Sequence, residues 1–111
     1  MTLEQVLANL RDANDRYNNL PLLNEVKSLC YILRDLGCNL TALVEIRKEY
    51  YLKFQSIIYN SKASSNAAKT KEAEFRVPEL DYIRKVLDQF TELRKDVRSQ
   101  ISYWKTQEES L

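Results

Sequence analysis

The chain has 111 residues, one glycine, two prolines and a formal net charge of +1. A sheet protein needs turn residues about every 8–12 positions, so this composition excludes a β fold and predicts a single all-α domain over residues 1–111. A net charge near zero gives no general attraction to nucleic acid, and the absence of histidine removes the commonest general base and metal ligand.

The first third of the chain predicts a pair of helices over residues 3–36. Thr2 is a suitable N-cap, and apolar residues then recur at helical spacing as far as Tyr17. Pro21 suits the first turn of the second helix. The apolar face of this second helix comprises Leu22, Val26, Leu29, Leu33 and Leu36.

Gly37 is the only glycine and follows the last apolar residue of that second helix. A glycine in this place commonly adopts the left-handed conformation that ends a helix, so we expect a break or kink near residues 37–39. The alternative is one continuous helix from Pro21 to Asn60, because an interior glycine costs only ~1 kcal/mol relative to alanine.

A third helix is predicted from Thr41 to Asn60. Its apolar band is wider than one seam, which indicates that it contacts more than one neighbour. The stretch 60–66 is polar and rich in small residues, so we place a connection here. A short helix over residues 67–76 follows, and Pro78 interrupts it because the residue before a proline is pushed away from helical geometry.

The last part of the chain, from Val77 onward, carries a heptad pattern of apolar residues, which is typical of a helix that packs along another helix. We expect residues 78–106 to pair with residues 41–60 in an antiparallel helical hairpin, and the hairpin to form a homo-oligomer. Arg94 occupies one seam position, where a charged residue can fix register or oligomer state. Trp104 is either a clasp on the N-terminal helices or an interface anchor. The predicted interface residues are Leu87, Phe90, Arg94, Val97, Ile101 and Trp104.

The residue types that carry chemistry do not indicate an enzyme. The carboxylates lie near lysines or arginines at helical spacing, as on solvated helix faces, and a single glycine cannot form a phosphate-binding loop. Cys30 and Cys38 fit neither a disulfide scaffold nor a zinc motif, so we predict two reduced thiols, no metal and no cofactor. No signal peptide and no stretch of ~20 apolar residues is visible, which predicts a soluble, cytoplasmic protein without membrane contact.

The middle of the chain is its one basic part. Residues 40–76 contain seven basic and four acidic residues, which leaves a net charge of +3, and aromatic residues such as Tyr50 and Tyr59 lie among them. Basic groups that follow phosphates, together with aromatic rings that stack on bases, are typical of single-stranded DNA binding. The alternative is that the aromatic residues belong to the core and the lysines form a solvated face.

The segment from Leu43 to Trp104 combines a helix that ends in tyrosines, a short link of serine and lysine, an Ala-Lys-x-Lys-x-Ala run over residues 68–73, and a long helix that ends in Trp104-Lys105. In these features, which span a little over half the chain, it resembles the bacteriophage recombination mediators, small helical-hairpin proteins that load a recombinase onto single-stranded DNA. The resemblance implies oligomerisation through the long helices and sequence-independent binding of single-stranded DNA. The DNA-binding residues that it implies are Lys53, Lys62, Lys69, Lys71 and Arg76.

These observations predict a non-enzymatic, oligomeric helical protein that binds single-stranded DNA and assists recombination or replication. The alternative is a protein-binding helical module, such as a phage-encoded inhibitor or adaptor of a host protein. A purely structural assembly component is the third hypothesis.

Overall fold

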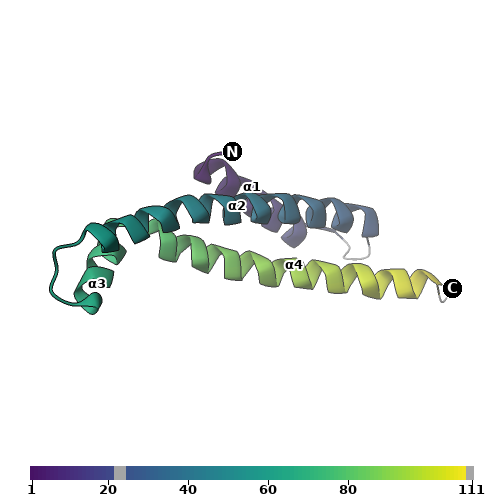
Figure 1. Ribbon diagram of the computed structural model, residues 1–111. Helices are drawn as coiled ribbons and strands as arrows, with labels where there is room; N and C mark the ends of the chain where they lie inside the picture. Colours follow the sequence, from purple (N-terminus) through teal and green to yellow (C-terminus); the bar gives the residue numbers. More distant parts are fainter. Residues whose placement is uncertain (22–24, 110–111) are drawn as a thin grey trace.

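The structure, a computed structural model, describes residues 1–21 and 25–109. These residues form four α-helices and no strand, which confirms the all-α prediction for this part of the chain. The molecule measures 68 × 23 × 18 Å, and its radius of gyration of 18.8 Å exceeds the value of about 13 Å expected for a compact domain of this length. The helices are α1 (Leu3–Asn18), α2 (Val26–Asn60), α3 (Asn66–Arg76) and α4 (Glu79–Glu109) (Figure 1).

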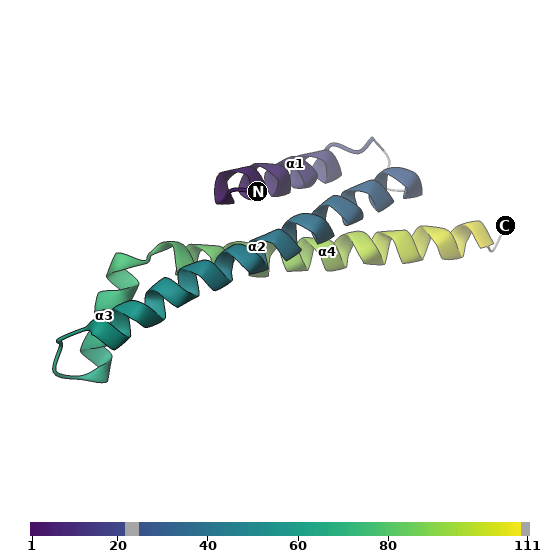
Figure 2. The ribbon, with the colours of Figure 1, turned by 45° about the horizontal axis from the view of Figure 1, so that its top comes forward.

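Helix α1 begins with a capping box, as Thr2 predicts. The backbone N–H of Gln5 donates to Thr2 Oγ1 at 3.2 Å, and the backbone N–H of Thr2 donates to Gln5 Oε1 at 2.8 Å, so two free donors at the helix start are satisfied. Val6, Leu10 and Ala13 of α1 are fully buried. They hold α1 against the first half of α2 (Figure 2).

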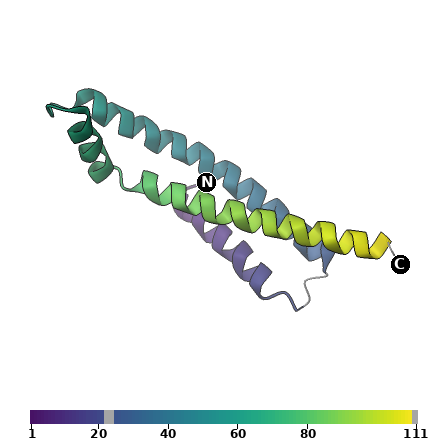
Figure 3. The ribbon, with the colours of Figure 1, turned by 90° about the horizontal axis from the view of Figure 1, so that it is seen from below.

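The core lies where α1, α2 and α4 meet. Helices α2 and α4 run side by side in opposite directions, as the views in Figure 1 and Figure 3 agree. Burying a large apolar side chain stabilises the fold by roughly 1.5–3 kcal/mol, so this cluster is the main source of stability. Besides the α1 residues, it comprises Leu29, Ile32, Leu36, Leu40 and Leu43 of α2 and Ile83, Val86, Phe90, Val97 and Ile101 of α4.

Helix α2 is continuous from Val26 to Asn60, so the predicted break near residues 37–39 is wrong. Gly37 has an ordinary helical backbone, and no described residue has a positive φ. The hydroxyl of Thr41 donates to the carbonyl oxygen of Gly37 at 2.9 Å. The buried face of α2 continues on both sides of Gly37. Burial of each large side chain contributes more than the ~1 kcal/mol that an interior glycine costs, so the helix stays continuous.

The start of α2 also differs from the prediction. Helix α2 begins at Val26, so Pro21 does not lie in its first turn. Val26 packs against the core, whereas the preceding Glu25 has a non-helical backbone. Packing, and not the conformational preference of the proline, therefore sets the start of the helix. Leu22, which we assigned to the apolar face, lies outside the described residues.

The segment of α2 that pairs with α4 lies further upstream than we expected. The buried residues of α2 end at Leu43, and Gly37 lies beside the Arg94 side chain of α4. Residues 26–36, which we assigned to a separate N-terminal pair, therefore pack against α4 as well as α1. Residues 44–60, which we expected to form the hairpin with α4, contribute no fully buried residue, although Ile46 and Tyr50 are half-buried against the core.

Helix α3 and the joint that follows it match the sequence prediction closely. The Ser65 side chain caps α3 by accepting a hydrogen bond from the backbone N–H of Ala68 at 3.1 Å. Val77 leaves helical geometry with φ −129° and ψ 65°, as expected for the residue before Pro78. The Val77 side chain is buried, so the joint is packed against the protein. It sends α4 away from the axis of α3 (Figure 3).

Candidate functional site

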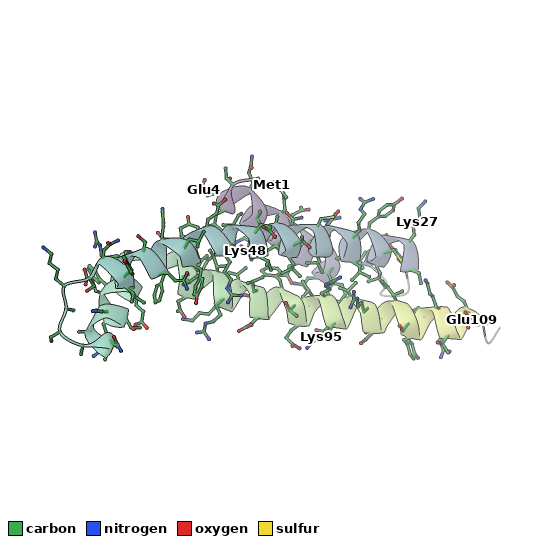
Figure 4. The ribbon with its side chains drawn as sticks, in the orientation of Figure 1. Met1, Glu4, Lys27, Lys48, Lys95 and Glu109 are labelled. Carbon is green, nitrogen blue, oxygen red and sulfur yellow. The ribbon has the colours of Figure 1, made fainter. Side chains whose placement is uncertain are left out.

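Few side chains are buried in the distal arm, which we define as residues 44–60 of α2 together with α3. None of residues 44–60 is buried, and α3 contributes only Ala73 to the buried set. Lys27 and Glu109 mark the opposite end of the molecule (Figure 4). The core contacts the start of the arm, where Ile46 and Tyr50 are half-buried against it, and the rest of the arm extends beyond the core.

An apolar stripe of four exposed residues runs along the arm. Val44, Tyr51, Leu52 and Tyr59 have exposed fractions of 39, 46, 65 and 89%. At about 100° per residue they fall within an arc of roughly 100° on α2, away from the face that continues the core. Lys48 is exposed within the same arc, and its ammonium donates to Glu45 at 3.0 Å. An exposed apolar row of this kind is typical of a contact site for another macromolecule.

A groove of about 580 Å³ lies at the junction of α2, α3 and α4. The rings of Tyr51 and Phe54 line one wall, stacked with their centres 6.5 Å apart. Two basic and two acidic side chains also line the groove, so its formal charge is balanced. These four residues are Arg47, Arg84, Glu74 and Asp81.

Asp81 is held ionised by its neighbours at the edge of this groove. Arg84 Nη2 lies 2.8 Å and Lys85 Nζ 3.1 Å from the two Asp81 carboxylate oxygens. Hydrogen bonds from Arg84 and then from Lys85 lower the pKa of Asp81 below its usual value, and the same contact with Asp81 raises the pKa of Arg84. Because Arg84 is already paired, the groove offers an apolar wall with balanced charge and no strong attraction for a phosphate chain.

The structure does not bring the five predicted DNA-binding residues together. Lys53 lies on α2 with its ammonium 5.5 Å from the centre of the Tyr50 ring, in a hollow that the first residues of the chain also line. Lys62 is exposed in the link between α2 and α3. Lys53 and Lys62 therefore belong to different parts of the surface.

The three remaining predicted residues lie on α3, where Lys69 and Arg76 share one face and Lys71 lies on another. Lys69 and Lys71 are two positions apart, which places them about 200° apart around the helix. Lys69 is half-buried and Lys71 is exposed. Arg76 Nη1 lies 3.6 Å from the Glu72 carboxylate, so part of its charge is compensated. A single basic patch made of all five residues is absent from this geometry.

The six predicted interface residues pack within the chain. Phe90, Val97 and Ile101 are buried in the core, and Leu87 and Trp104 are half-buried against it. Arg94 is half-buried beside Gly37 of α2. Trp104 is therefore a clasp on the core, and the heptad face of α4 is covered by the other helices of the same chain. The apolar stripe of the arm, which the sequence did not lead us to expect as a site, stays exposed to solvent. The sequence feature that could have indicated this stripe is the apolar band of the predicted helix from Thr41 to Asn60, which is wider than one seam.

The described residues contain no group of three or more cysteine, aspartate or glutamate side chains that could hold a metal ion. Over the same residues, no helix is both long and apolar enough to span a bilayer. Comparisons of the chain with protein-family models, with curated proteins and with solved structures gave no match.

Proposed function

We propose that this chain is a non-enzymatic helical module that binds protein through the apolar stripe of its distal arm, and that it assembles with itself through this stripe. One observation carries the proposal: Val44, Tyr51, Leu52 and Tyr59 form an exposed apolar row on α2. The paired helices α2 and α4 serve as a hairpin-like stem that presents the arm. Helix-on-helix docking uses rows of this spacing.

The stripe is complementary to itself when two copies pair in antiparallel fashion. A two-fold axis between positions 51 and 52 places Tyr51 opposite Leu52 of the second copy and Val44 opposite its Tyr59. Lys48 then faces Gln55. In a parallel pair, Lys48 would face Lys48 of the second copy, and two like charges at close range are unfavourable. The antiparallel, two-fold arrangement is therefore the one that the stripe favours.

The length of the stripe sets the expected strength of this contact. Positions 44 to 59 span about 22 Å of helix. A contact of this length lies at the lower end of specific protein interfaces. We therefore expect a dimer that dissociates in the micromolar range.

Sedimentation velocity over a concentration series tests the proposal. Leu52→Lys removes an apolar contact at the axis and brings two positive charges together, so it should shift the association to at least about tenfold higher concentration. The matched control is Tyr103→Lys, which adds the same charge at another exposed residue, on α4. Equal association of the wild type and Leu52→Lys would refute the stripe as the interface.

Single-stranded DNA binding is a second candidate function, supported by a specific observation on the arm and its link. Tyr59 and Phe75 have exposed fractions of 89 and 87%, and Lys62 and Lys71 are exposed in the same region of the chain. Exposed aromatic rings near lysines suit stacking on bases and contact with phosphates. This combination is also what a recombination-mediator-like role would need.

A fluorescence-anisotropy titration with a labelled single-stranded oligonucleotide at low salt tests this second candidate. The combined change Lys62→Ala and Lys71→Ala should weaken binding and reduce its salt dependence. The control removes two exposed lysines of α4, through Lys85→Ala and Lys95→Ala. No binding by the wild type at low salt would eliminate this function.

A further inference from the structure

Three arginines line one shallow groove between α2 and α4, on the part of the molecule that the core supports. Arg34 comes from α2, and Arg94 and Arg98 come from α4. Gly37 and Thr41 form part of the floor. No acidic residue lines this groove, in contrast to the balanced groove of the distal arm.

The positive charge of this arginine groove is largely uncompensated. Within the described residues, neither Arg94 nor Arg98 forms an ion pair, whereas Arg34 Nε lies 3.6 Å from Asp35. Asp35 makes its shorter contact, 2.7 Å, with Arg16 of α1. Arg94 and Arg98 are also four positions apart on one helix, where like charges are mutually destabilising. The fold therefore keeps three positive charges together, and their one carboxylate partner in the described part of the chain, Asp35, is shared between Arg34 and Arg16.

Packing fixes the position of Arg94 in this groove. Arg94 is half-buried, and its Nε is shielded from solvent without a hydrogen-bond partner. Its guanidinium lies over the backbone of Gly37, because a Cβ added there would be 3.7 Å from Arg94 Nη2. An arginine that is already held in place loses little side-chain freedom when it binds a ligand.

We propose that this arginine groove is a binding site for phosphate groups. Guanidinium groups are planar and donate pairs of parallel hydrogen bonds to phosphate oxygens. Three of them around an open groove suit a ligand with neighbouring phosphates, such as pyrophosphate or the backbone of a nucleic acid. The site is separate from the distal arm and does not depend on the function proposed for the apolar stripe.

Isothermal titration calorimetry of the full chain tests this site with two probes, inorganic pyrophosphate and a single-stranded oligothymidylate. The double variant Arg94→Gln with Arg98→Gln should weaken binding by about tenfold or more, because it removes charge-assisted hydrogen bonds. The matched control, Lys85→Gln with Lys95→Gln, removes the same charge from α4 outside the groove. It should bind like the wild type.

The two probes distinguish the sources of phosphate. Arginine-dependent binding of both probes supports a general phosphate site, and arginine-dependent binding of the oligonucleotide alone supports a nucleic-acid backbone site. If neither probe binds the wild type, or if the lysine control loses as much affinity as the arginine variant, the proposal is overturned. If the double variant does not fold, the single variant Arg34→Gln tests the proposal, because Arg34 is exposed and its replacement leaves the core intact. An unchanged affinity of Arg34→Gln for the probes would overturn the proposal.

Discussion

Replacing Gly37 with alanine should stabilise the protein. Gly37 lies in the interior of α2 with helical backbone geometry. A Cβ at this position would meet Arg94 Nη2 at 3.7 Å, which is an ordinary van der Waals contact. Gly37→Ala therefore gains helix propensity without a clash. In a helix interior that gain is about 0.5–1 kcal/mol.

The corresponding shift in melting temperature follows from the size of the chain. The entropy of unfolding is about 2.1 cal/mol/K per residue, or about 0.23 kcal/mol/K for 111 residues, so Tm should rise by about 2–4 °C. Thermal unfolding followed by circular dichroism measures this shift. A fall in Tm would refute the continuous helix, because alanine destabilises a position that needs a positive φ.

Two further predictions concern the contacts of α1. Asn9→Ala removes the side-chain N–H donor that lies 3.0 Å from the side-chain oxygen of the buried Asn39. It should lower the free energy of unfolding by about 1–2 kcal/mol. A double-mutant cycle with Asn39→Ala that gives no coupling energy would contradict this contact. Burial, and to a smaller extent the nearby Asp96, raises the pKa of the Tyr17 hydroxyl above 10.0. The neutral Tyr17 side chain therefore contributes fully to stability below about pH 10, and this contribution is lost as pH rises through the higher folded-state pKa. Tyr17→Phe should lack this loss, and an identical alkaline decline of Tm in wild type and variant would refute the reasoning.

The sequence was informative wherever local chemistry decides the structure. Thr2 marks a helix start because its side chain accepts a hydrogen bond from a free backbone N–H group. Pro78 marks the joint between α3 and α4 because its ring restricts the preceding residue. The apolar face of α4 was also visible, since Ile83, Phe90 and other buried residues recur at helical spacing.

The errors arose where tertiary packing outweighs a local preference. Gly37 is a typical helix terminator in isolation, yet the core on both sides of it keeps α2 continuous. Periodicity showed that α4 has an apolar face but not which surface covers it, so core residues such as Val97 were assigned to an interface between subunits. The arginine groove was invisible for the same reason, because Arg34 and Arg94 are brought together only by the pairing of α2 with α4.

The most direct test of the proposed assembly is the mass of the unmodified chain in solution. Sedimentation equilibrium from low to high micromolar concentration should show a weight-average mass that rises from the monomer toward twice the monomer mass. The same measurement on Leu52→Lys should remain near the monomer mass over that range. A strict monomer for the wild type at high micromolar concentration would contradict self-association through the apolar stripe.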